Sequence, residues 1–175
     1  MSINTKAIIA IALGAAFWCG VLLYNPPADI KQAAVANDAT RLIPQKHLYT
    51  PEELLKETND ERAKVGLPSL KIDENLNISA QLKADDMKAN NYWGHVNPST
   101  GAHGYEYIRK TEGNSCKLSG ENLSHVINFG DPLMTWMNSK PHKEAILSSQ
   151  YDTVGFGYVE VGQEIYYVQH FCDVR

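Results

Sequence analysis

The spacing of apolar residues changes from a helical period to a strand period along residues 48–175. The first helix is predicted to begin at Thr50, because Thr50 can cap a helix, Pro51 suits its first position and Glu53 completes a capping box. Gly66 follows the apolar stripe of this segment and is expected to end the helix.

A second helix is expected from Asp73 to about Asn91, because apolar residues recur there on one face. These residues are Leu76, Ala80, Ala84 and Met87. Its end would deliver His95 into the turn that follows. Shorter helices are expected at three further places, namely Gly104–Lys110, the segment after Asp131-Pro132, and the segment that begins at Pro141.

The C-terminal segment has the pattern of a β-hairpin. Residues 154–161 and 164–172 are rich in Val, Ile, Tyr and Phe, and Gly162-Gln163 separates them. Glycine at the first position of a two-residue loop predicts a type II′ turn. Residues 116–118 are expected to add a third strand. Helices before and after a small antiparallel sheet indicate a layered α+β domain.

An uncharged segment lies at the N-terminus. Residues 7–24 are long enough to cross a bilayer as a helix, Lys6 precedes them, and Asn25-Pro26-Pro27 ends the apolar run. This pattern predicts a membrane anchor with the domain outside the cytoplasm. A cleaved signal peptide is the alternative, although Ala34-Val35-Ala36 lies far beyond Tyr24 for a cleavage site. Both interpretations predict an extracytoplasmic domain, either anchored or secreted.

The domain organisation follows from these patterns. Residues 1–24 are interpreted as an anchor or signal segment, and residues 25–47 as a tether, because they are rich in Ala, Pro and polar residues without a sustained period. Residues 48–175 are interpreted as one folded domain of ordinary size. The formal net charge is −4, with no cluster of Lys and Arg, which argues against a nucleic-acid partner.

Two cysteines fall within the predicted domain. Outside the cytoplasm, Cys116 and Cys172 would most simply form a disulfide. Two free buried thiols are the alternative. A Cys/His metal site is disfavoured because the chain contains no C-x-x-C spacing.

Three segments each place a His or Glu near a Gly or Pro that restricts the backbone. They are Tyr92-Trp93-Gly94-His95-Val96-Asn97-Pro98, Gly120-Glu121-Asn122-Leu123 and Trp136-Met137-Asn138-Ser139-Lys140-Pro141-His142. Two histidines and a carboxylate are the residue types of a divalent-metal or acid–base site. Their order and flanking residues resemble the CAP superfamily (cysteine-rich secretory proteins, antigen 5 and pathogenesis-related proteins), in its bacterial SCP-like branch.

The resemblance extends over residues 48–172. It includes residues 59–68, which are similar to the family's first helix and its exit, and residues 151–158, which are similar to the family's first C-terminal strand. It implies a three-layer α-β-α sandwich of the CAP type. It also implies that His95, Glu121 and His142 line a central cleft.

Two functions of different class are expected from these residues. In the first, His95, His142 and Glu121 hold a divalent metal, with zinc favoured, beside an unidentified small-molecule, lipid, glycan or protein ligand. In the second, the same cleft serves a metal-assisted hydrolase, a peptidase or a cell-wall-degrading enzyme, with Glu121 as general base. Catalytic residues stay unknown at this point, with Glu121 and Ser139 as candidates, and so does whether the protein is an enzyme.

Ser139 departs from the family pattern, since many relatives have a second glutamate there. It lies outside any G-x-S-x-G elbow, which argues against serine-hydrolase chemistry. His103 and His125 are expected to extend a polar rim at most, and His170 to pack in the sheet. Trp93 is expected to be a core or cleft-wall residue, with a sugar-binding platform as the alternative.

Overall fold

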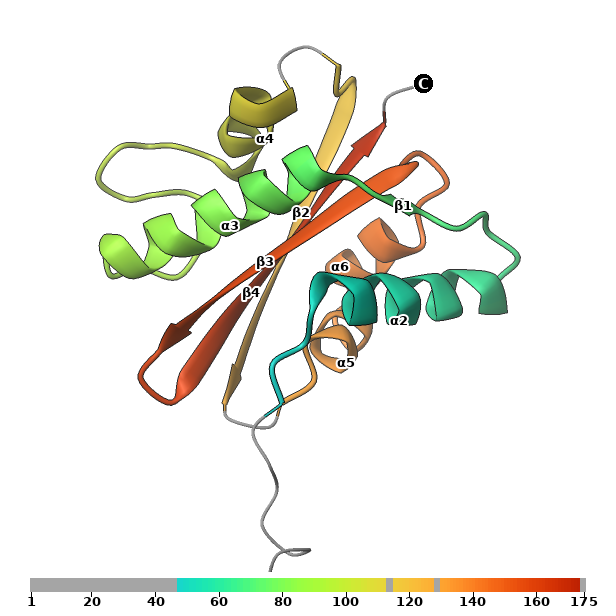
Figure 1. Cartoon of the computed structure of the whole chain (residues 1–175), viewed down its shortest axis with the longest axis horizontal. Coiled ribbons are helices and arrows are strands. Elements are labelled where there is room, and N and C mark those ends of the chain that lie inside the picture. Colours follow the sequence, from blue (N-terminus) through green and yellow to red (C-terminus); the bar gives the residue numbers. More distant parts are fainter. Residues whose placement is uncertain (1–46, 113–114, 128–129, 174–175) are drawn as a thin grey trace, which may run out of the picture. The chain divides into compact units, whose positions relative to one another are not determined.

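A four-stranded mixed sheet forms the middle of the domain (Figure 1). The computed structural model describes residues 47–112, 115–127 and 130–173. The strands are β1 (Lys71–Ile72), β2 (Leu118–Ile127), β3 (Thr153–Val161) and β4 (Glu164–Asp173), in the spatial order β1-β3-β4-β2. Strand β1 runs parallel to β3, and the other neighbours are antiparallel. The predicted α+β class is confirmed.

Helices cover both faces of this sheet. Helices α3 (Glu74–Ala89) and α4 (Gly104–Glu112) lie on one side, and α2 (Pro51–Lys64), α5 (Pro132–Met137) and α6 (Lys140–Ile146) lie on the other (Figure 1). Strand β2 lies at the edge of the sheet, where α4 approaches from one side and α5 and α6 from the other. Residues from both helical layers therefore meet along this strand.

The N-terminal predictions lie outside the described residues. These are the anchor or signal helix in residues 1–24 and nearly all of the tether in residues 25–47. Within the segments that the structure describes, no helix combines the length and the apolar character needed to span a bilayer.

The predicted helix starts are confirmed. Thr50 and Glu53 form a reciprocal capping box, in which the Thr50 amide donates to Glu53 Oε2 at 2.8 Å. Asp73 caps α3 and Asp131 caps α5 through their carboxylates. Ser139 is the N-cap of α6, but its side chain makes no capping hydrogen bond.

Apolar clusters fill the space between the sheet and the helices on each of its faces. One packs α2, α5 and α6 on the sheet around Leu54, Trp136, Ile146 and Phe171, and the other packs α3 on its opposite face around Ala80, Ala84, Met87, Leu123 and Val168. Helix α3 comes very close to β3. A Cβ at Gly155 would lie 2.5 Å from Leu76 Cβ, and one at Gly157 would lie 2.6 Å from Gln81 Cα. Only glycine permits this approach.

The C-terminal hairpin is as predicted. Val161 pairs with Glu164 across the two-residue loop, and Gly162 has φ +65°, the sign that the first position of a type II′ turn requires. Cys116 and Cys172 form a disulfide with their Cα atoms 5.4 Å apart, which links the residues before β2 to the end of β4.

Strand β2 differs from its prediction. It covers ten residues rather than the three residues 116–118, so Glu121 lies inside a strand. The period-2 pattern was hidden because polar residues, among them Glu121, Asn122 and Ser124, occupy positions that face the helices. Strand β1 was not predicted, since two residues give no period.

Candidate functional site

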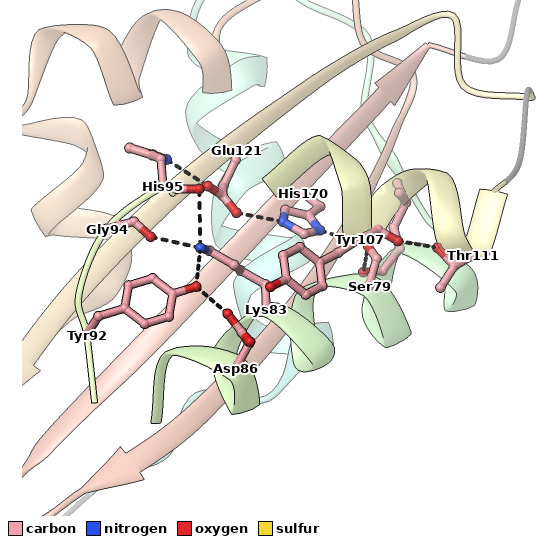
Figure 2. A network of polar contacts seen from close by, with 11 residues as sticks. Ser79, Lys83, Asp86, Tyr92, Gly94, His95, Tyr107, Thr111, Glu121 and His170 are labelled. Carbon is pink, nitrogen blue, oxygen red and sulfur yellow. Dashed lines mark hydrogen bonds and ion pairs between the residues drawn. The ribbon is translucent and has the colours of Figure 1, made fainter. Parts of the chain in front are cut away.

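Glu121 is the centre of the candidate site. Its side chain is 8% exposed, and its two oxygens contact different imidazoles: Oε1 lies 2.7 Å from His95 Nδ1 and Oε2 lies 2.9 Å from His170 Nε2 (Figure 2). Burial raises the pKa of Glu121, but the hydrogen bonds from His170 and His95 outweigh burial and hold the pKa below its ordinary value. Glu121 is therefore an ionised carboxylate that orients two rings.

His95 presents its other nitrogen to solvent. It lies in the turn between α3 and α4, and its side chain is 54% exposed. Since Glu121 accepts a hydrogen bond from Nδ1, the proton of the neutral ring is on Nδ1 and the lone pair is on Nε2. A ligand that approaches from solvent would meet this Nε2 atom.

His170 extends the contacts into the core. It is fully buried on β4, directly opposite Glu121 in the strand register. Ser79 Oγ on α3 lies 2.7 Å from His170 Nδ1 and 2.9 Å from the Leu76 carbonyl oxygen, so both ring nitrogens of His170 have a partner. The prediction that His170 packs in the sheet is confirmed, but its contact with Glu121 was not predicted.

Lys83 fixes the turn that carries His95. This lysine is fully buried on α3, and its Nζ donates to Tyr92 Oη at 2.9 Å, to the Gly94 carbonyl at 2.8 Å and to the His95 carbonyl at 3.3 Å (Figure 2). Burial lowers the pKa of Lys83, whereas the charges of Glu121 and Asp86 raise it. Lys83 was not predicted as a site residue, although it lies on the buried face of the predicted helix.

The carboxylate of Asp86 also holds the turn that carries His95. It accepts from the Tyr92 hydroxyl and, at 3.0 Å, from Asn97 Nδ2. Burial raises the pKa of Asp86, but the hydrogen bonds from Tyr92, Tyr107 and Asn97 bring it below its ordinary value. Burial and the contact with Asp86 in turn raise the pKa of Tyr107 to about 12. Both ends of the turn are thus held by buried polar contacts.

His142 approaches from the other helical layer. It lies near the start of α6, and its carbonyl accepts from Asn122 Nδ2 on β2 at 3.1 Å. Its Nδ1 atom is buried and has no hydrogen-bond partner among the residues that the structure describes. Burial and then the charge of His95 lower the pKa of His142, which favours the neutral ring.

A cavity of about 320 Å³ opens beside Glu121. Its lining residues come from the His95 turn, α4 and the start of β2, and they are His95, His103, Gly104, Tyr105, Ile108, Ser119, Gly120 and Glu121. His103 thus borders the site. His125 lies further along β2 and pairs with Glu164 at 3.2 Å.

The arrangement differs from a three-ligand metal centre. Over residues 47–112, 115–127 and 130–173, no group of three or more His, Cys, Asp and Glu side chains is placed to hold a metal ion. Both carboxylate oxygens of Glu121 are already engaged by imidazoles. What the structure offers to a ligand is an oriented His95 imidazole, a neutral His142 and the adjoining cavity.

The layered fold and the histidine–glutamate pair in its cleft define an SCP-like domain. Residues 55–171 match the family model described as the cysteine-rich secretory protein family, CAP. The chain belongs to this family.

Proteins of two bacteria illustrate this relationship. YkwD of Bacillus subtilis is 34% identical over 139 residues, which cover 79% of this chain and 53% of that protein. YlbC, a membrane protein of Bacillus subtilis, is 31% identical over 144 residues, which cover 81% of this chain and 39% of that protein. The chain thus spans about half the length of the first relative and less of the second. An outer surface protein of Borrelia burgdorferi superposes with a TM-score of 0.64 at 26% identity, covering 71% of this chain and 92% of that one.

Proposed function

We propose that this domain is an extracytoplasmic binding module that holds a divalent cation, with zinc favoured, through His95 and His142. The carboxylate–imidazole contact between Glu121 and His95 carries the proposal. In metal sites a ligating histidine commonly donates its second ring N–H to a carboxylate, which fixes the tautomer and raises the basicity of the ligating nitrogen. Glu121 and His95 have this arrangement, at 2.7 Å.

His142 fits as the second ligand. Metal binding requires neutral imidazole, and the lowered pKa of His142 supplies that form. Over the described part of the domain, its buried Nδ1 atom has no hydrogen-bond partner. Glu121 then serves as the orienting group rather than as a third ligand, because its oxygens are occupied by His95 and His170. Positions left open on the cation would accept water or a ligand from the cavity.

The location outside the cytoplasm rests on the sequence and on the relatives. Residues 7–24 have the composition of an anchor or signal segment. One relative is named a membrane protein, and a protein of similar structure is named an outer surface protein. We therefore place the domain on the outer side of the cell membrane, tethered or released, where its cleft meets envelope components.

Calorimetric titration of the full-length chain with zinc tests the proposal. His95→Ala and His142→Ala are expected to abolish binding, and Glu121→Gln to weaken it by about 10- to 100-fold through misorientation of His95. His125→Ala is the matched control, since this histidine pairs with Glu164 instead. Equal zinc affinity of the wild type and the His95→Ala/His142→Ala double variant would refute the assignment. Turnover of peptide or peptidoglycan that Glu121→Gln abolishes would favour the hydrolase instead.

A further inference from the structure

An exposed aromatic surface lies along β2, on the same side of the sheet as Glu121. Trp93 was expected to be a core or cleft-wall residue, but it is 42% exposed. Its ring centroid lies 4.8 Å from that of Tyr166 and 5.5 Å from that of His125. We name Trp93, His125 and Tyr166 the Trp93 platform.

A second aromatic pair lies at the other end of this strand face. The rings of His103 and Tyr105 stack with centroids 5.5 Å apart and planes 25° apart. Tyr105 is 47% exposed, and both residues line the cavity beside His95 and Glu121.

The strand register sets the order of these features. Ser119 and Gly120 line the cavity, Glu121 follows and pairs with His170, and His125 pairs with Tyr166. Residues 121 and 125 point to the same face because side chains alternate along a strand, and four residues span about 13 Å. In strand order the polar centre therefore lies between two aromatic surfaces. Because Leu123, between Glu121 and His125, is buried against α3, a ligand that reaches both surfaces would follow the outer edge of β2. This layout suits an extended ligand with repeated units.

The chemistry of the Trp93 platform narrows the class of ligand. Its ring centroids lie 4.8–5.5 Å apart, so the rings pack against one another. No space is left between them for an organic cation. Its three members carry no permanent positive charge, and Glu164 pairs with His125 at its border. Anionic lipids and nucleic acids, which need Lys and Arg, are therefore poor matches.

A neutral sugar ring matches these features. A pyranose has an apolar C–H face, which packs on the negative face of an aromatic ring, and hydroxyl groups at its rim, which hydrogen-bond to groups such as Glu164 and His125. We propose that the outer edge of β2 binds an extended neutral glycan, with one sugar on Tyr105 in the cavity, the chain passing the exposed His95, and another sugar on the Trp93 platform. The proposal rests on the cleft described above as the binding site but does not require the cation.

Fluorine NMR on the full-length chain labelled with 5-fluorotryptophan provides the test. The chain contains three tryptophans, and Trp93→Phe assigns the Trp93 signal. Chitotetraose is expected to shift this signal, while buried Trp136 serves as an internal reference. In calorimetric titration with the same saccharide, Trp93→Ala and Tyr105→Ala are each expected to weaken binding about tenfold through the loss of one stacked ring. Met134→Ala, an exposed residue of α5 on the opposite side of the sheet, is the matched control and should bind like wild type.

Several outcomes would overturn the glycan proposal. They are an unshifted Trp93 signal at millimolar saccharide, equal affinities of Trp93→Ala and Met134→Ala, and equal affinities of the disaccharide and the tetrasaccharide, because the last would exclude an extended track. Zinc titration of the same samples separates the two proposals. Trp93→Ala should bind the glycan about tenfold more weakly and keep its zinc affinity, whereas His142→Ala, a residue outside the cavity lining, should lose zinc and keep the glycan-induced shift of Trp93.

Discussion

At the scale of single residues, the domain depends on buried charges that hold an exposed imidazole. Glu121 contacts the ring of His95, and Lys83 donates to its backbone carbonyl. The motif pattern predicted His95 and Glu121 as site residues because the family resemblance marked them. Lys83 and His170 were missed because a buried Lys in a helix or a His in a strand carries no sequence signal apart from its position on the core-facing side.

Lys83→Met tests the role of this buried lysine. The substitution would leave the Gly94 and His95 carbonyls without their charged donor, and hydrogen bonds to charged groups contribute about 1.5–3 kcal/mol each. We expect the free energy of unfolding in urea to fall by about 2–3 kcal/mol, together with weaker zinc binding as the His95 turn loosens. Lys88→Met, an exposed change on the same helix, is the control. Equal stability of the two variants would contradict this role.

At the scale of elements, the start of α4 must come close to the Glu121 carboxylate. A Cβ at Gly104 would lie 2.6 Å from Glu121 Oε1 and closer still to Oε2, and Glu121 cannot swing away without losing an imidazole. Sequence analysis predicted this helix and placed its start correctly at Gly104. The steric reason for glycine became visible only once β2 was seen to extend through Glu121.

Gly104→Ala is therefore expected to destabilise the domain by about 1–3 kcal/mol and to weaken zinc binding. Combining it with Glu121→Ala removes the obstructing carboxylate, so the two changes should be non-additive in a double-mutant cycle of urea unfolding. Additive losses would show that the glycine acts on the backbone of α4 rather than on Glu121.

Some elements of this fold could be predicted from local sequence signals, and others could not. Helices with capping residues and the Gly162-Gln163 hairpin were predicted because each depends on local signals. The approach of α4 and α6 to the same edge strand from opposite sides depends on sheet order, which no local pattern encodes. The family resemblance supplied that part of the expectation.

At the scale of the whole molecule, two partly buried carboxylates link stability to pH. The pKa values of Glu121 and Asp86 are lowered from ordinary values of 4.5 and 3.8. Because the folded-state values lie below those of the unfolded chain, their stabilising contribution is complete above about pH 4.5 and is lost as the pH falls through the folded-state values.

Urea unfolding measured from pH 7 down to pH 2 checks this linkage. Wild type should lose stability across the acid range, and Asp86→Asn should lose less, because it has one fewer titrating carboxylate. The stability difference between the two proteins should shrink as the pH falls below 3.8, the ordinary pKa of Asp86. A difference that stays constant with pH would show that Asp86 contributes nothing through its charge.

The packing of α3 on the sheet requires glycine at two positions of β3. Gly155 and Gly157 let α3 rest against the strand, and the same helix carries Ser79 and Lys83. The distance between helix and sheet is thus set by two hydrogen atoms that take no part in binding. A methyl group at either position would push α3 away from the sheet and tilt it. The tolerance of this domain to mutation therefore depends on the absence of side chains at these two positions of β3 as much as on the residues in the cleft.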